Sequence, residues 1–390
     1  SNFLDKWVHR FVAQTLWLPE SEQGRLQLIQ NYFELSEAAR QRSAGLARLS
    51  VQQEPDAVEA ASLTAELQSL NSDREGKRAA VEEVLESTIS SVVAGLGMAS
   101  VGGFIFPPVD IRLTEPPKLL VTSPRDKILR AGDVLLSSDI TTEASVVIEN
   151  TILQEENLSA LVTGIGGLAT YPAFVLNDRS LRFVLQLGAH EWVHHYLAFR
   201  PLGQTYFKNG DMQTLNETFA DIAGREIGDL AYLLLGGHIE PSAESVITED
   251  NQQQENPAQF DFNSEMRQTR TEVDRLLEEG RIEEAEAYME QQRLLFVENG
   301  YLIRKLNQAY FAFYGTYAES PTSSSPIGEQ MREFRRLSGD LTTFMQSMAG
   351  ISTYAEFLGK LEQLQDSAAI HFEDLPFFYQ SAVYTGYAPT

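Results

Sequence analysis

The sequence from residue 181 to residue 199 reads LRFVLQLGAHEWVHHYLAF and contains three of the six histidines of the chain. Apolar residues surround this stretch on nearly every side at helical spacing, which predicts an interior helix. His190 and His194 are four residues apart, so both rings leave the same face of such a helix and can share one metal ion. Glu191 would project beside that ion and could deprotonate a water bound to it. The stretch therefore predicts a buried helix that carries a metal site.

A histidine pair packed in an apolar core is the alternative interpretation of this helix. Burial accounts for Leu185 and Trp192, but it does not account for Glu191, because an unpaired buried carboxylate is costly unless a metal or hydrogen bonds compensate it. We therefore favour the metal site. A metzincin arrangement is excluded, since it needs glycine and histidine where this chain has Leu197 and Arg200.

A second acidic motif follows on the next predicted helix. Residues 216 to 221 read Asn-Glu-Thr-Phe-Ala-Asp, and neighbouring apolar residues predict that this helix is also buried. Glu217 and Asp221 are four residues apart and therefore lie on one face of it. Glu217 follows His194 by 23 positions.

Together the two motifs resemble the gluzincins, the thermolysin-like and aminopeptidase-like zinc peptidases. Their pattern is His-Glu-x-x-His on one helix and Asn-Glu-x-x-x-Asp, or a close variant, on the next. The spacing here is slightly longer than in the best-known members, and an insertion around residues 201 to 211 would absorb the difference. The resemblance implies one Zn²⁺ per chain bound by His190, His194 and Glu217, with Glu191 as general base and Asp221 orienting a ligand histidine.

The resemblance also implies an edge strand upstream of the active-site helix that pairs with the backbone of a peptide substrate. The glycine-rich segment 164–175 lies where that strand is expected, and its candidate substrate contacts are Gly167, Ala169 and Tyr171. A plain edge strand remains an alternative. A phosphate-binding loop is disfavoured, because no Lys-Ser or Lys-Thr follows and the glycine spacing does not fit a dinucleotide site.

The motifs do not identify the group that stabilises the oxyanion, which in this family is a tyrosine or a histidine. Tyr314 and Tyr317 are favoured, although aromatic residues at helical spacing are more often core than catalytic. The full set of candidates is His195, His238, Tyr310, Tyr314, Tyr317 and His371. An acidic motif for binding a substrate amine is not identifiable either, so endopeptidase and exopeptidase activity both stay open.

Around the two motifs the sequence predicts an α+β, predominantly helical chain. The resemblance to gluzincins implies that this chain contains a zincin-like catalytic core. Short apolar runs separated by proline and glycine predict strands at 111–113, 119–121 and 134–136 of a small mixed sheet. The segment 276–288 resembles one helical hairpin of a tetratricopeptide repeat. The expected regions are a helical N-terminal region (1–100), the core with the sheet, the active-site helix and the glutamate helix (101–240), a mobile acidic linker or loop (241–263), and a helical C-terminal region completing the cleft (264–390).

Composition limits the functions open to the chain. Its 390 residues include 55 acidic and 30 basic side chains, giving a net charge of −25, and no cysteine. This acidity disfavours nucleic acid and anionic membrane surfaces as partners. The absence of cysteine leaves histidine, aspartate and glutamate as the strong metal ligands. The uncharged run between Glu86 and Asp110 is not expected to span a membrane, since it contains several serines and glycines and ends in Pro107-Pro108.

We therefore expect a zinc-dependent peptidase acting on a peptide or protein substrate by a Glu-activated zinc-bound water. A location outside the cytoplasm, or at a membrane through an N-terminal anchor, is favoured over a cytoplasmic one. A catalytically silent zincin-fold scaffold that binds a partner through the 264–318 helices is one alternative, and the intact Glu191 argues against it. A metallohydrolase acting on a non-peptide amide is the other.

Overall fold

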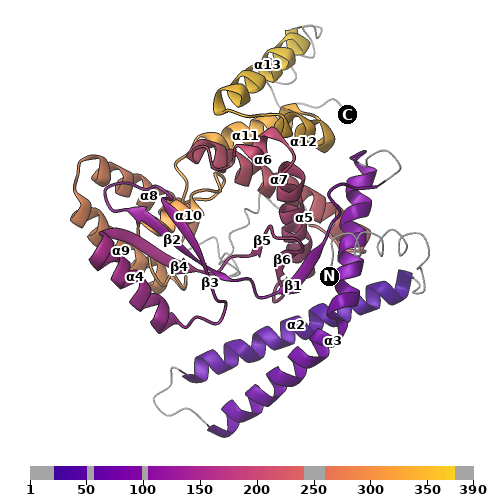
Figure 1. Cartoon of the computed structure of the whole chain (residues 1–390), viewed down its shortest axis with the longest axis vertical. Helices are drawn as coiled ribbons and strands as arrows, with labels where there is room; N and C mark the ends of the chain where they lie inside the picture. Colours follow the sequence, from indigo (N-terminus) through magenta and orange to yellow (C-terminus); the bar gives the residue numbers. More distant parts are fainter. Residues whose placement is uncertain (1–21, 51–56, 99–103, 241–259, 374–390) are drawn as a thin grey trace. The chain divides into compact units, whose positions relative to one another are not determined.

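The computed structural model describes residues 22–50, 57–98, 104–240 and 260–373 (Figure 1). The described residues within 1–117, 164–196 and 222–243 form the first of two compact units, and those within 118–163, 197–221 and 244–390 form the second. Helices predominate, and the described residues include two sheets of three short strands each. The predicted α+β, predominantly helical class is thereby confirmed. Most of the predicted linker, residues 241–259, lies outside the described residues, and Phe262 already begins a helix.

The first unit begins with two long helices, α2 (Glu22–Ser50) and α3 (Ala57–Gly95), which lie side by side (Figure 1). Near the end of α3, an apolar stripe at helical spacing is buried. The buried apolar residues of α3 are Val81, Val84, Leu85, Ile89, Val92 and Val93.

The sheet of the first unit has the strand order β1-β6-β5, from β1 (Ile111–Thr114), β6 (Ala173–Leu176) and β5 (Gly167–Leu168). Strand β1 runs parallel to β6, and β5 runs antiparallel to it. Carboxylates of α3 cover the outer side of β1, where the backbone N–H groups of Ile111 and Leu113 each donate over 2.8 Å, to Glu86 and Glu82 respectively. One edge of this sheet is therefore closed by α3, and β5 forms the other edge among the described strands.

The sheet of the second unit is antiparallel with the order β3-β2-β4, from β3 (Gly132–Leu136), β2 (Lys118–Pro124) and β4 (Leu158–Thr163). The three predicted strands therefore exist, but they belong to two sheets and not to one. Pro116 and Pro117 separate β1 from β2. Strand β2 then pairs with β3 and β4 and not with the strands of the first sheet.

A buried carboxylate ties helix α4 (Thr142–Glu156) to this second sheet. Glu149 is 1% exposed, pairs with Arg304 and Lys305, and accepts a hydrogen bond of 2.7 Å from the backbone N–H of Val162 in β4. Helix α10 (Gln308–Tyr314) packs against β2 and β4, and its N-cap Asn307 donates from its side chain to the carbonyl of Ala160 over 2.9 Å. Hydrogen bonds as well as apolar contacts therefore hold α4 and α10 against this sheet.

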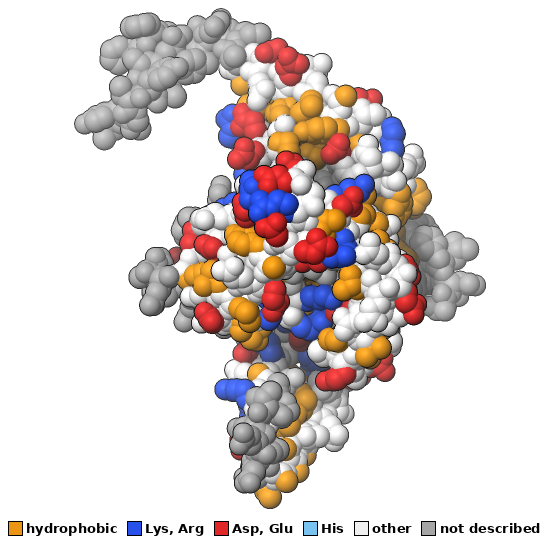
Figure 2. Space-filling model, turned by 90° about the vertical axis from the view of Figure 1, so that its left-hand side faces the viewer, with side chains coloured by type: hydrophobic (Ala, Val, Ile, Leu, Met, Phe, Trp, Pro, Cys, Tyr) orange, Lys and Arg blue, Asp and Glu red, His pale blue; other side chains and the backbone are white. Residues whose placement is uncertain are grey.

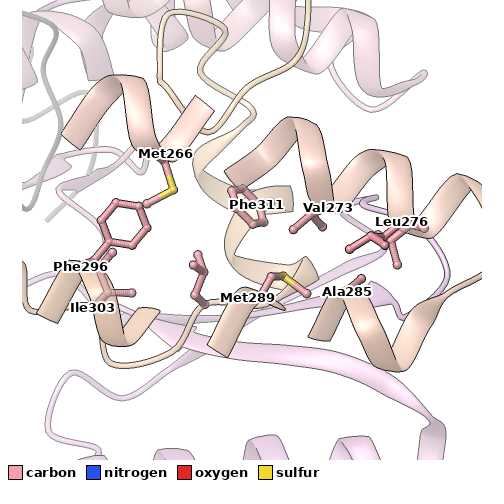
Figure 3. Packing of buried hydrophobic residues seen from close by; sticks show 10 residues of the cluster. Met266, Val273, Leu276, Ala285, Met289, Phe296, Ile303 and Phe311 are labelled. Atoms are coloured by element: carbon pink, nitrogen blue, oxygen red, sulfur yellow. The ribbon is translucent and has the colours of Figure 1, made fainter. Parts of the chain in front are cut away.

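Helices α8 (Phe262–Glu278) and α9 (Ile282–Glu298) form the predicted helical hairpin, which turns at Gly280 with φ of 71°. Their facing side chains form an apolar core with α10 (Figure 3). The residues that Figure 3 labels are Met266, Val273, Leu276, Ala285, Met289, Phe296, Ile303 and Phe311.

The second unit continues with three helices, α11 (Ile327–Leu337), α12 (Leu341–Ala349) and α13 (Tyr354–Glu373). On the face shown in Figure 2, basic side chains lie among acidic ones. Exposed ion pairs within one helix, such as Arg275 with Glu272, add little to stability. Within the described ranges, every helix is too short or too polar to cross a membrane.

Candidate metal centre

Helix α5 (Leu181–Leu197) carries His190, Glu191 and His194, and its apolar neighbours hold it in the interior. The indole N–H of Trp192 donates to the carbonyl of Pro107 over 2.9 Å, which fixes the helix about its axis. At Gly188 an added Cβ would lie 3.3 Å from Ile89 of α3, so α5 passes close to that helix. The predicted interior helix is confirmed.

Helix α7 (Gly210–Leu234) lies against α5 through two glycines. A Cβ added at Gly224 would lie 2.7 Å from the Cα of His190, and one at Gly228 would lie 2.3 Å from the Cα of Gln186. Because Gly228 follows Gly224 while Gln186 precedes His190, the two helices run antiparallel. Only glycine allows this approach of the two backbones, and it places α7 directly against the helix turn that carries His190.

Glu217 lies on α7 seven residues before Gly224, which is nearly two helical turns, so both residues lie on the same face of the helix. The ligand atoms of His190, His194 and Glu217 all lie within 4.8 Å of one another. The two sequence motifs thus converge. His190 and Glu217 are buried, and His194 is half-buried.

The geometry of this group suits a metal ion. The Nε2 atoms of His190 and His194 are 3.0 Å apart. Two nitrogen ligands of a tetrahedral zinc ion are about 3.3 Å apart for bonds of about 2.05 Å. Two imidazoles and one carboxylate form a donor set that suits zinc and other divalent transition metals. These three residues could therefore hold a metal ion.

Glu191 lies against the edge strand β5. Its side chain is buried, and a Cβ added at Gly167 would lie 2.1 Å from its Oε1 and 2.8 Å from its Cδ. Position 167 must therefore be glycine for Glu191 to occupy its place. The sequence predicted both residues as site residues, but it did not predict this contact between them.

The edge strand is shorter than predicted. Gly167 belongs to β5, whereas Ala169 and Tyr171 lie in the connection between β5 and β6. Nε2 of His195 donates to the carbonyl oxygen of Thr170 over 2.7 Å, and the ring of Tyr171 lies 5.5 Å from the ring of His195. Helix α5 therefore holds this connection in place through the residue that follows His194.

His195 itself is held as a neutral side chain. Burial lowers its pKa, and this outweighs the hydrogen bond to Thr170, which raises it. Its Nδ1 is buried and has no hydrogen-bond partner among the described residues. The ring therefore acts as a donor to Thr170 through Nε2.

Tyr206 contacts the predicted ligand Glu217 and was not predicted from the sequence. Its hydroxyl donates to Oε1 of Glu217 over 2.6 Å and accepts from Nε2 of Gln213 over 3.1 Å. Burial and the charge of Glu217 raise the pKa of Tyr206, so the phenol stays protonated and keeps donating. Tyr206 lies in the segment that the sequence suggested only as an insertion, and no spacing rule singles it out.

The other oxyanion candidates lie in different surroundings. The hydroxyl of Tyr314 is 3.0 Å from Oγ1 of Thr163, and the ring of Tyr310 lies 4.5 Å from that of Tyr314. Tyr317 is half-buried just after α10, and His238 is exposed and paired with Glu240. The side chain of His371, the remaining oxyanion candidate, lies outside the described residues.

Asp221, which was predicted to orient a ligand histidine, is half-buried on α7, one turn after Glu217.

Comparison with known proteins found no matching family model, no matching curated protein and no matching solved structure.

Proposed function

We propose that this protein is a zinc-dependent peptidase in which His190, His194 and Glu217 bind the metal and Glu191 is the general base. The observation that supports this most is the convergence of the ligand atoms of two sequence motifs within 4.8 Å, on two helices whose backbones are in contact. A buried group of two histidines and a glutamate is the ligand set of a catalytic zinc site, which keeps a fourth position open.

His190, His194 and Glu217 would hold the Zn²⁺ ion, which would supply Lewis-acid chemistry toward the substrate carbonyl and the attacking water. Glu191 accepts a proton from the attacking water and later gives it to the leaving amine. The carbon–nitrogen bond of the peptide breaks, the hydroxyl joins the carbonyl carbon, and the hydrogen joins the amine. The contact with Gly167 places the Glu191 carboxylate beside the backbone of β5.

Strand β5 supports a peptide as the substrate. It pairs with β6 alone among the described strands, so its other side can pair with an extended chain. Main-chain hydrogen bonds of that kind hold a peptide regardless of its sequence and bring its carbonyl groups beside Glu191. Ala169 and Tyr171 follow directly and would contact substrate side chains.

The experiment is digestion of a peptide library by the purified protein, with and without a chelator, followed by return of Zn²⁺. We expect cleavage that the chelator abolishes and zinc restores, with about one zinc bound per chain. Cleavage that persists after complete metal removal would exclude the proposal. Zinc binding without any cleavage would favour the silent scaffold, and cleavage of small amides alone would favour the non-peptide hydrolase.

A further inference from the structure

Glu191 and His195 lie four residues apart on α5, so their side chains leave the same face of the helix. The two proposed histidine ligands each precede them by one residue, which is about 100° around the helix. Glu191 contacts Gly167 of β5, and Nε2 of His195 donates to the carbonyl oxygen of Thr170 over 2.7 Å. All of these residues belong to the first unit. One face of α5 therefore carries the histidine ligands, and the neighbouring face holds β5 and the residues that follow it.

Thr170 is the residue at which the connection after β5 is held together. Its N–H donates to the carbonyl oxygen of Leu168 over 2.7 Å, and its hydroxyl donates to that of Pro172 over 2.7 Å. Its own carbonyl oxygen accepts the hydrogen bond from His195, whose ring also lies 5.5 Å from the ring of Tyr171. His195 therefore ties this whole turn to α5, directly at the end of β5.

The hydrogen-bond register shows which backbone groups of β5 face away from β6. The N–H of Leu176 donates to the carbonyl oxygen of Gly166 over 2.9 Å, so these two residues lie at a hydrogen-bonded position of the ladder. Antiparallel strands alternate between hydrogen-bonded and non-hydrogen-bonded pairs, and Gly167 lies opposite Val175 in the next pair. The N–H and C=O of Gly167 therefore point away from β6, to the edge where a further chain can pair.

We propose that His195 is a positioning residue, which holds β5 so that Gly167 presents its N–H and C=O to the backbone of the peptide substrate. This inference rests on the proposed function. Strand β5 is two residues long and pairs with β6 alone among the described strands, so its own ladder holds it weakly. Hydrogen bonds to a peptide weaken steeply when donor and acceptor leave their preferred geometry. The attachment to α5 through His195 keeps the strand in place before the peptide arrives, which lowers the cost of binding.

Loss of this attachment should weaken peptide binding and leave the chemical step intact. Glu191 and the histidine ligands keep their places, because α5 is fixed separately by the hydrogen bond from Trp192 to the carbonyl of Pro107. His195→Leu should therefore raise the KM of a cleaved peptide about tenfold, with kcat changed less than about twofold and the zinc content unchanged. His195→Gln should restore KM, since the glutamine amide nitrogen can donate to Thr170 as Nε2 of histidine does.

The test measures peptide binding directly, on the zinc-loaded full chain in which Glu191→Gln prevents turnover. Two pools of random hexapeptides, capped at both ends, are passed over the immobilised protein, and mass spectrometry measures the amount retained. The pools differ only in that one carries methyl groups on its backbone nitrogens, which removes the main-chain donors. With His195 intact, the unmodified pool should be retained at least about tenfold better. His195→Leu should abolish most of this preference, and His195→Gln should keep it.

Thr170→Val examines the same turn from its other side and keeps the inference testable if His195→Leu fails to fold. It removes the hydroxyl that donates to Pro172, and the preference for the unmodified pool should fall about threefold. Thr151→Val is the matched control, since Thr151 is an exposed residue of α4 whose hydroxyl donates to the carbonyl of Val147. That substitution should leave the preference unchanged.

Equal retention of the two pools with His195 intact, or a preference that neither His195→Leu nor Thr170→Val changes, would overturn the inference. Loss of zinc in His195→Leu would also overturn it, because His195 would then act on the metal site. These outcomes are separate from those of the proposed function. Cleavage by the wild type with an unchanged KM in His195→Leu rejects the role of His195 alone. A preference that depends on His195 without any cleavage rejects the peptidase and leaves a strand that binds peptides.

Discussion

The Glu191 carboxylate lies close against the backbone of Gly167 in β5: a Cβ at position 167 would lie 2.1 Å from Oε1 of Glu191. The atom in the way is the end of a flexible side chain, so a methyl group there can be accommodated by moving the carboxylate. The position of the proposed base therefore depends on a glycine that lies 24 residues earlier in the chain.

Gly167→Ala should therefore leave the protein folded and able to bind zinc, but reduce peptide hydrolysis about 100-fold, because a catalytic group displaced by about 1 Å loses much of its effect. The measurement is kcat/KM together with zinc content. Gly164→Ala is the matched control, since an added Cβ there meets nothing within 4 Å. Full activity of Gly167→Ala would show that the function of Glu191 does not depend on glycine at position 167.

Gly224→Ala should act on stability as well as on metal binding. The added methyl group would meet the backbone of His190 at 2.7 to 2.8 Å, and backbone cannot swing away as a side chain can. We expect a loss of about 1–3 kcal/mol in the free energy of unfolding and weaker zinc binding, measured by urea denaturation and zinc titration. Gly210→Ala on the same helix has open space and should change neither quantity. An unchanged zinc affinity in Gly224→Ala would argue that α7 does not position the ligands.

Tyr206→Phe removes the hydroxyl that donates to Glu217 over 2.6 Å. Hydrogen bonds to metal ligands fix their orientation, and their loss typically weakens metal binding about 10- to 100-fold. A competitive zinc titration measures this, with the folded state followed by circular dichroism. Phe207→Leu serves as the control, because Phe207 is 94% exposed. Equal zinc affinity in Tyr206→Phe and wild type would show that Tyr206 does not support Glu217.

Glu149 should make the second unit sensitive to acid. Burial raises its pKa, but Arg304, the N–H of Val162 and Lys305 outweigh burial and hold the pKa below the ordinary 4.5. A carboxyl group with a lowered pKa stabilises the folded state at pH above its unfolded value, and this stabilisation is lost as the pH falls through the folded value. The free energy of unfolding should therefore drop below about pH 4.5.

Glu149→Gln should cost about 2–3 kcal/mol of stability at pH 7, because charged hydrogen bonds in the interior are lost. Urea denaturation between pH 3 and pH 7 measures both quantities, and the variant should depend less on pH than the wild type. Glu272→Gln is the control: Glu272 forms an exposed pair with Arg275, so this substitution should change the free energy of unfolding little. A stability difference between Glu149→Gln and wild type that stays constant over this range would contradict the role of its ionisation.

The parts of the fold that depend on local periodicity could be predicted from the sequence. Helices α5 and α7 follow from their 3.6-residue apolar spacing, and this spacing also set which faces carry His190, His194 and Glu217. The division of the strands into two sheets could not be predicted, because strand pairing joins residues far apart in the chain, such as Ile111 with Ala173.

Two features of the candidate site were beyond the sequence for a similar reason. The contact of Gly167 with Glu191 depends on how closely β5 approaches α5, and no residue pattern encodes that distance. Tyr206 lies in a connecting segment, where neither helical nor strand periodicity applies. The motifs therefore supply the candidate ligands and base, whereas the residues that orient them become visible only in three dimensions.

The most direct test of the peptidase compares zinc-loaded wild type with zinc-loaded Glu191→Gln on the same peptide library. The substitution keeps the size of the side chain but removes its capacity to accept a proton. We predict that both proteins bind about one zinc per chain and that only the wild type cleaves peptides. Cleavage by Glu191→Gln at the wild-type rate, or a wild-type protein that binds no zinc, would contradict the account.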